Sequence, residues 1–181
     1  MYCKMSLTIV LICLIQYYII QVIVAQEIPH YSSVRNYISD LGNTRLSPRA
    51  KWMNASFLTN GILIAISAVM LNIDNYSRVT MILSAVGAAL VAFNPSDKNS
   101  TLHVTGATMS FIFGNLSLLM MAAFSSALPS QVRRIYAAAG IVGSLGLIYY
   151  TIGANPSNLG FLERINSYPQ SIALILSALY F

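Results

Sequence analysis

Six apolar stretches divide this chain, and they constrain its fold more than any other feature of the sequence. They cover residues 7–25, 56–71, 79–93, 107–128, 135–152 and 165–181. A helix needs about 20 residues to cross a hydrocarbon core. Only helices and closed barrels satisfy their backbone hydrogen bonds in lipid, and these stretches are too long for barrel strands. The sequence therefore predicts an all-α integral membrane bundle of six transmembrane helices, in one domain over residues 1–181.

The composition agrees with a membrane protein and argues against several soluble classes. Hydrophobic residues make up 56% of the chain and charged residues 8%, which is too little polar surface for a soluble domain of 181 residues. The net charge of +5 favours anionic membrane lipids as partners. No Gly-rich phosphate loop or aromatic-interleaved basic patch supports a nucleotide or nucleic-acid partner. The histidines and cysteines lack metal-ligand spacing, so we expect no metal site and no cofactor.

The alternation of apolar stretches and polar connections predicts three hairpins, made by spans 1–2, 3–4 and 5–6, with their long connections on one side. An Asn-Pro-Ser motif follows the third and the fifth span, and its proline, Pro95 or Pro156, cannot continue a helix. We expect both prolines to end helices at the same membrane level. Gly42 is expected to permit a tight turn with positive φ, and Pro169 to mark a further turn.

The membrane orientation depends on which basic residues act as anchors. Lys and Arg are slightly more numerous on the side of the long connections, and by count alone that side would be cytoplasmic. Some of these residues stand next to acids, as in Asp97-Lys98, whereas Arg133-Arg134 forms a compact basic turn on the side of the termini. Such a turn is typical of a cytoplasmic anchor. We predict a multi-pass protein of the cell membrane with cytoplasmic termini.

Short polar motifs recur in a fixed order through the long connections. They are Tyr31-Ser32, Ile38-Ser39-Asp40-Leu41-Gly42, Asn54-Ala55-Ser56-Phe57, Pro95 followed by His103, Ala107 and Phe111, then Gly160 with Glu163-Arg164, and Tyr168-Pro169. At these residues the chain resembles an uncharacterised family of prokaryotic polytopic membrane proteins, the domain-of-unknown-function family numbered 998. The resemblance extends from about Tyr31 to Pro169, and Asn94 before Pro95 departs from it. It implies a helical membrane fold and no established activity.

Four polar residues in these motifs are candidate catalytic residues: Ser39, Asp40, His103 and Glu163. An imidazole titrates near neutral pH, so His103 with carboxylates could perform acid–base chemistry, and Ser39, Ser56 or Ser100 could act as a nucleophile. This combination would give an ester hydrolase at the lipid interface. The simpler interpretation is structural, because Asp and Ser oxygens accept the free amides at a helix start and a single histidine is a weak catalytic signal.

The charged residues of the connections are candidate ion-pair or lipid-headgroup contacts: Arg35, Asp40, Asp97 and Arg164. Arg164 could pair with Glu163, reach across to Asp40, or bind a lipid phosphate through its planar guanidinium group. Isolated charges beside short spans are costly. We therefore expect Asp40, His103 and Arg164 to cluster on one face of the bundle near the membrane interface.

Three classes of function fit these features. The favoured class is an accessory subunit of a membrane assembly, with spans 1 and 6 contacting other subunits, because the chain has almost no mass outside its spans. The second class is an interfacial lipid-modifying hydrolase with an Asp, His and Glu-Arg site. The third is a small transporter, which six spans and proline breaks allow, although no charge lies deep inside an apolar stretch.

Overall fold

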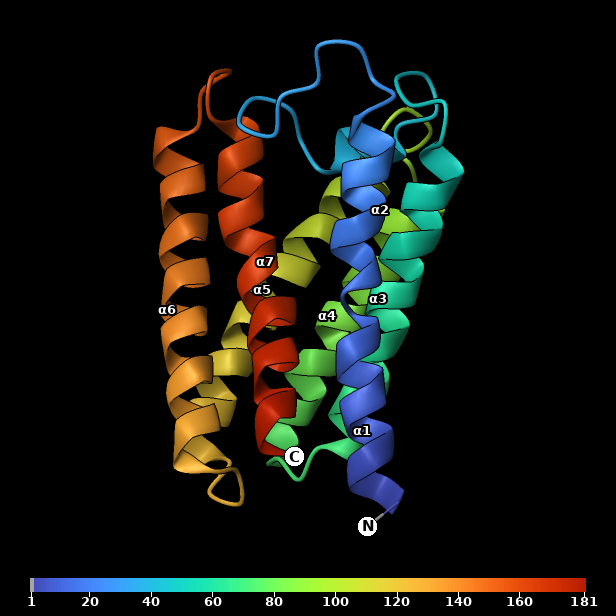
Figure 1. Cartoon of the computed structure of the whole chain (residues 1–181). Helices are drawn as coiled ribbons and strands as arrows, with labels where there is room; N and C mark the ends of the chain where they lie inside the picture. The colour runs from blue at the N-terminus through green and yellow to red at the C-terminus, as the bar shows by residue number, and fades with distance from the viewer. Residues whose placement is uncertain (1) are drawn as a thin grey trace.

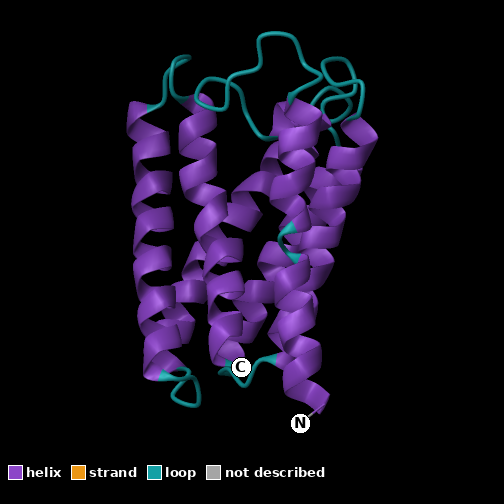
Figure 2. Ribbon diagram, in the orientation of Figure 1, coloured by secondary structure: helices purple, strands orange, loops and turns teal. Residues whose placement is uncertain are grey.

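The computed structural model describes residues 2–181, with side chains from Ser6 onward, and within them it contains helices and no strands (Figures 1 and 2). The helices are α1 Tyr2–Cys13, α2 Gln16–Ala25, α3 Ala50–Met70, α4 Asn75–Phe93, α5 Ser100–Phe124, α6 Ser130–Gly153 and α7 Leu159–Ser177, with short 3-10 helices η1 Ser39–Gly42 and η2 Ala178–Tyr180. Both chain ends lie at the end of the bundle opposite the long connections (Figure 1). The predicted all-α hairpin arrangement is confirmed.

Five segments are long and apolar enough to cross a membrane, namely residues 6–25 together with α3, α4, α5 and α6. The last helix, α7, completes the six-helix bundle but is more polar than the others. Its polar residues Glu163, Asn166 and Gln170 are buried inside the bundle. A hydropathy average treats every side chain as lipid-facing, so it underestimates a helix whose polar face points inward. The chain is a multi-pass membrane protein.

Several helices begin earlier than the apolar stretches predicted. Helix α3 begins at Ala50 instead of residue 56, α5 at Ser100 instead of 107, α6 at Ser130 instead of 135 and α7 at Leu159 instead of 165. For α3, α5 and α7 the added turns lie at the end with the long connections and carry polar residues, including His103 and Glu163. Hydropathy does not detect these turns, because their polar side chains pack against neighbouring segments instead of facing lipid.

The first span is not one helix, which corrects the continuous stretch expected over residues 7–25. Helices α1 and α2 are separated at Leu14 and Ile15, where the amide of Ile15 bonds to the carbonyl of Ile12 at 3.0 Å in a tighter 3-10 pattern. Just after this break, the Ser56 hydroxyl of α3 donates to Gln16 Oε1 at 2.9 Å. The polar pair fastens the interrupted span to α3.

The two Asn-Pro-Ser motifs end helices, as predicted. Helix α4 ends at Phe93, just before Pro95, and α6 ends at Gly153, just before Pro156. Both ends lie at the end of the bundle that carries the connection between α2 and α3 (Figure 1). The turn expected at Pro169 is wrong, because this proline lies inside α7. Pro169 has no amide for the carbonyl of Ile165, and α5 supports the adjacent residue of this turn, since Asn115 Nδ2 donates to the Asn166 carbonyl at 3.0 Å.

Glycines allow close contacts between the central helices. A Cβ on Gly87 would lie 2.6 Å from the carbonyl oxygen of Gly106, so α4 and α5 meet backbone to backbone. On α6, Gly143 leaves the space that the Asn115 side chain occupies, and Gly146 leaves space for the side chains of Ile165 and Asn166. The bundle therefore accommodates polar side chains in its interior, between the central helices.

Candidate functional site

The long connection between α2 and α3 folds into the end of the bundle instead of covering it from outside. Ile38, just before η1, and Leu41 within it are 1% and 0% exposed, so their side chains are inserted between the helices. Gly42, which ends η1, does not have the positive φ that was expected. It is needed for space, because a Cβ there would overlap the Asn54 side chain, whose Nδ2 donates to the Gly42 carbonyl at 2.9 Å. Position 42 therefore requires glycine for close packing and not for a turn with positive φ.

Arg164 on α7 binds the backbone of this connection. Its Nη1 lies 2.7 Å from the carbonyl oxygen of Ser33 and 3.1 Å from that of Asn36, and its Nη2 donates to the Tyr31 hydroxyl at 2.7 Å. Gly160, one helical turn earlier, has no room for a Cβ because the Asn36 carbonyl lies against it. Arg164 is therefore a clamp that holds the connection against α7.

The ion pairs expected for Arg164 with Glu163 or Asp40 are wrong. Within the described residues the ion pairs are Arg49 with Glu27 at 2.6 Å, and Lys98 with Asp97 at 4.0 Å. The Arg164 guanidinium instead donates to neutral oxygen atoms: the carbonyls of Ser33 and Asn36 and the Tyr31 hydroxyl on the connection, and the Gly160 carbonyl on α7.

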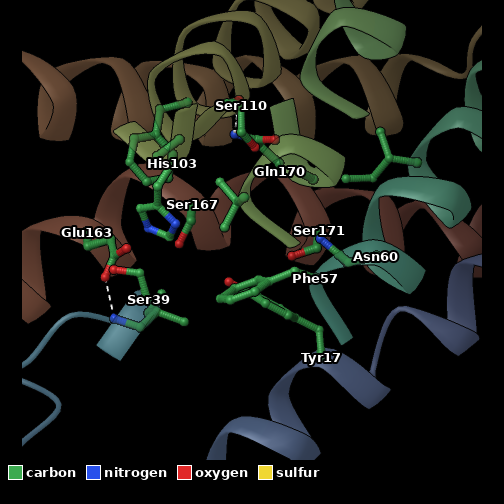
Figure 3. A pocket seen from close by; sticks show the side chains of 16 residues that line it. Tyr17, Ser39, Phe57, Asn60, His103, Ser110, Glu163, Ser167, Gln170 and Ser171 are labelled. Atoms are coloured by element: carbon green, nitrogen blue, oxygen red, sulfur yellow. Dashed lines mark hydrogen bonds between the residues drawn. The ribbon is translucent and has the colours of Figure 1, made fainter. Parts of the chain in front are cut away.

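Glu163, which directly precedes Arg164 on α7, holds the start of η1 in place. Its side chain is buried, and its carboxylate accepts hydrogen bonds from the backbone amides of Ile38 and Ser39. Successive amides at a helix start present partial positive charge to an acceptor. Glu163 is thus held in one position by main-chain donors, with Ser39 beside it (Figure 3).

Asp40, the second residue of η1, caps the preceding turn by reaching back to it, as in a capping box, and within the described residues it forms no ion pair with an arginine. Its Oδ2 accepts the backbone amide of Tyr37 at 3.0 Å. Burial raises the pKa of Asp40, and the hydrogen bonds from Tyr37 and Asn36 oppose this shift. The His103 and Arg164 charges lower it further only to a smaller extent. The hydrogen bond to Tyr37 therefore supports a structural role for Asp40. The arginine partner expected for Asp40 is absent among the described residues.

His103 is oriented by a single hydrogen bond. It lies in the first turns of α5, is 6% exposed, and its Nδ1 is 2.8 Å from the carbonyl oxygen of Asn94. A carbonyl only accepts, so Nδ1 carries the hydrogen, and in the neutral ring Nε2 keeps its lone pair. Asn94 caps the end of α4 just before Pro95, and this helix stop therefore sets the tautomer of His103.

The remaining sequence candidates lie outside this cluster. Ser56 is bonded to Gln16 on the first span, and Ser100 is exposed at the start of α5. Asp97 accepts the backbone amide of Thr44 at 2.9 Å and its hydroxyl at 2.5 Å, which ties two connections together. Arg35 is exposed on the connection. The structure brings Ser39, Asp40, His103 and Glu163 to one cavity. Arg35, Asp97 and Arg164 do not line this cavity, although Arg164 lies at the same end of the bundle, against the connection that carries Asp40.

The four clustered residues line an outer cavity of about 490 Å³ between η1 and helices α5, α6 and α7. Its polar end also includes the hydroxyls of Tyr37 and Tyr150, which lie 3.2 Å apart. Its walls are largely apolar, formed by Val104, Ala107, Phe111, Ile112 and Leu147, with Thr108 and Thr151 between them. Val104 and Ile112 are also exposed on the outside of the bundle, so the cavity borders the lipid-facing surface.

A second, inner cavity of about 50 Å³ lies on the other side of the same residues, among α2, α3, α4, α5 and α7 (Figure 3). Ser39, His103 and Glu163 line both cavities, together with the apolar side chains of Ala107 and Phe111, and these five shared residues form the wall between the cavities. The inner cavity is lined by further polar residues that the sequence reasoning did not select, including Asn60, Ser110, Ser167 and Gln170. One signal was present: Glu163, Ser167 and Gln170 follow at helical spacing and form one stripe on α7.

Substitutions at Asp40 distinguish a cap from a buried ion pair. Asp40→Asn keeps an acceptor for Tyr37 and removes a charge that burial disfavours, so we expect the free energy of unfolding to change by less than about 1 kcal/mol. Asp40→Ala should lower it by about 1 kcal/mol, through loss of the cap. Thermal unfolding of both variants in detergent measures this. A loss of about 3–5 kcal/mol for Asp40→Asn, as for a broken buried pair, would contradict the cap.

Comparison with known families gives one result for the chain. Residues 11–180 match the model of a family described as a protein of unknown function, DUF998. The match confirms the resemblance seen in the ordered motifs, and it spans all six helical segments of the bundle. No curated protein and no solved structure matches the chain.

Proposed function

Because the chain belongs to the DUF998 family, whose function is unknown, we propose a function from the geometry of its cavities: the protein binds an amphiphilic lipid and hydrolyses an ester bond beside the lipid headgroup. The observation that carries this proposal is the outer cavity. Its polar end holds Ser39, Asp40, His103 and Glu163, while its walls toward the lipid-facing surface are largely apolar. This division matches a molecule with a polar head and an apolar chain.

The size and position of the outer cavity support a lipid headgroup as its occupant. A volume of about 490 Å³ lies within the roughly 300–1,000 Å³ that ligand sites occupy. The cluster lies at the end of the bundle with the long connections, where a headgroup would be, and Phe111 and Leu147 lie farther along α5 and α6. An ester carbonyl sits between the head and the chain of such a lipid, next to the polar end.

His103 supplies the acid–base function in this proposal. Its Nε2 is free to accept a proton, since Nδ1 is committed to Asn94. Asp40 lies at the same polar end of the cavity, and the His103 charge lowers its pKa, so the Asp40 carboxylate in turn stabilises an imidazolium. Within the described residues no hydrogen bond joins Ser39 to His103, so His103 does not activate Ser39 as a nucleophile in this proposal. The Ser39 hydroxyl instead donates a hydrogen bond to the ester carbonyl, and water is the nucleophile.

The other functional hypotheses stay predictions. An accessory role, with partner subunits against spans 1 and 6, depends on contacts that a single chain does not contain. A transporter would need a polar pathway through the bundle. Cytoplasmic termini and residence in the cell membrane also stay predictions. The outer cavity favours the lipid hydrolase because it combines an apolar chain site with a candidate base in one place.

Filling the outer cavity tests lipid binding. Leu147 lines this cavity on α6, and we expect Leu147→Trp to lower the amount of lipid that co-purifies with the protein at least tenfold. Leu145 is 60% exposed on the same helix, so Leu145→Trp is the matched control and should retain its lipid. Mass spectrometry of the purified protein measures the bound lipid. Equal lipid content in the two variants would contradict the lipid site.

Removing the base tests the chemistry separately. With His103→Gln we expect hydrolysis of diacyl phosphatidylglycerol in mixed micelles to fall by about 10²–10⁴, the range for loss of a general base. Co-purifying lipid should stay at the wild-type level, because glutamine preserves a polar side chain in the wall. Hydrolysis by His103→Gln at the wild-type rate would exclude the proposed base.

A further inference from the structure

We propose that the inner cavity is a water site that delivers the attacking water to His103 from the side opposite the lipid. The use of this water rests on the proposed hydrolysis, whereas its presence rests on the cavity alone. Asn60 and Ser167 are the residues that we assign to hold it. The outer cavity would then admit the lipid and the inner cavity the water, with Ser39, His103 and Glu163 between them.

The first observation behind this proposal is that the two cavities are lined from different sides of the bundle. The outer cavity is lined from α6, which contributes Leu147, Tyr150 and Thr151. The inner cavity has no lining residue from α6 and is closed instead by Tyr17 of α2 and Phe57 of α3. It follows α7 from Glu163 to Ser171, a rise of about 12 Å at 1.5 Å per residue. A molecule in the inner cavity therefore reaches the shared wall from inside the bundle.

The second observation is that two oxygen atoms in the inner cavity lack hydrogen-bond partners that water could supply. Asn60 Oδ1 and Ser167 Oγ both belong to residues that line the inner cavity. Both atoms are buried, and neither makes a hydrogen bond of normal length and angle within the described part of the chain, although the Tyr17 side chain interacts with Ser167. An unsatisfied buried polar group costs about 1–3 kcal/mol. Buried waters typically satisfy such groups, and about 50 Å³ accommodates roughly three water-sized spheres of about 15 Å³.

The other polar side chains deeper in the cavity are already bonded, so they do not compete for this water. Gln170 donates to the Ser110 carbonyl at 3.1 Å and accepts from the Ser84 hydroxyl at 3.1 Å. Ser171 is bonded to the Tyr18 hydroxyl at 2.6 Å. Ser167 lies one helical turn after Glu163 on α7 and lines the inner cavity together with His103 (Figure 3). A water held by Ser167 would therefore share this cavity with the candidate base.

The step itself balances with water as the only co-reactant. The water oxygen forms a bond to the acyl carbon of the ester while its proton passes to His103 Nε2. The bond between the acyl carbon and the alkoxy oxygen then breaks, and the leaving alkoxide takes the proton from His103. A fatty acid and an alcohol leave, and His103 returns to its neutral form. Asn60 and Ser167 act as positioning residues because they touch the water and not the lipid.

Hydroxyl-radical footprinting of the detergent-solubilised full chain tests for the water directly. Radiolysis of a bound water labels the side chains that surround it. Tyr17 lines the inner cavity and is 5% exposed, whereas Tyr136 is 0% exposed in the apolar core and lines neither cavity. We expect labelling of Tyr17 to exceed that of Tyr136 at least fivefold in the wild type. Equal labelling of the two tyrosines would overturn the water site without any variant being needed.

Two variants connect the water to the reaction. Asn60→Leu and Ser167→Val remove the unsatisfied oxygens, and each should lower Tyr17 labelling at least threefold and kcat for phosphatidylglycerol at least tenfold, with KM unchanged. Ser117→Ala is the matched control, since Ser117 is a buried serine of α5 that bonds to the Gly114 carbonyl and lines neither cavity. Lost labelling with an unchanged kcat would overturn the delivery role. Absent hydrolysis in a wild type with labelled Tyr17 would contradict the proposed function and leave the water site standing.

Discussion

Gly160→Ala is expected to lower the free energy of unfolding by about 3 kcal/mol or more, because the new Cβ would overlap a backbone atom that cannot yield easily. That atom is the Asn36 carbonyl oxygen, and the Ser33 carbonyl oxygen lies only 2.7 Å from the same position. Both carbonyls also accept from Arg164, so moving the connection away breaks these bonds. Alanine is favoured over glycine inside a helix by about 1 kcal/mol, so helix propensity predicts the opposite sign.

The measurement is thermal unfolding in detergent, combined with limited trypsin digestion. Arg35 is exposed on the connection, and cleavage after it should accelerate in Gly160→Ala if the connection detaches from α7. Gly153→Ala is the control, because a Cβ there meets only the ring of Tyr149, an exposed side chain that can rotate away. An unfolding temperature for Gly160→Ala equal to that of Gly153→Ala would disprove the close contact between α7 and the connection.

Arg164→Ala is expected to have the second largest effect, a loss of about 2–4 kcal/mol in the free energy of unfolding. The substitution leaves the carbonyls of Ser33 and Asn36 and the hydroxyl of Tyr31 without their common donor. Arg164→Lys should recover less than half of this loss. A single ammonium group keeps the charge but does not reproduce the planar fork that reaches both the carbonyls and the hydroxyl.

Thermal unfolding of Arg164→Ala, Arg164→Lys and Arg35→Ala distinguishes this clamp from a general charge effect. Arg35 lies on the same connection, and among the described residues its side chain makes no hydrogen bond or ion pair, while its backbone amide donates to the Ser32 carbonyl at 3.1 Å. Arg35→Ala should therefore change the free energy of unfolding by less than about 0.5 kcal/mol. If lysine restored full stability at position 164, charge alone would explain the role of Arg164, and the backbone clamp would be wrong.

The candidate site was predictable in part because its residues belong to ordered motifs. Ser39, Asp40, His103 and Glu163 were selected from polar residue types beside apolar spans, and they do meet at one cavity. Their partners were not predictable. Arginine and carboxylate were expected to pair because charge is visible in a sequence, whereas Glu163 and Arg164 instead bind amides and carbonyls, which every residue carries and no pattern marks.

The sequence by itself determined the helical membrane bundle, its three hairpins and the helix ends before Pro95 and Pro156. These features follow from local chemistry: apolar length, and the missing amide of proline. Only the tertiary structure decided that α7 turns a polar face inward and that one wall separates two cavities. The physical reason is distance along the chain, because the bond from Ile38 to Glu163 joins residues 125 positions apart, and no local pattern specifies such a contact.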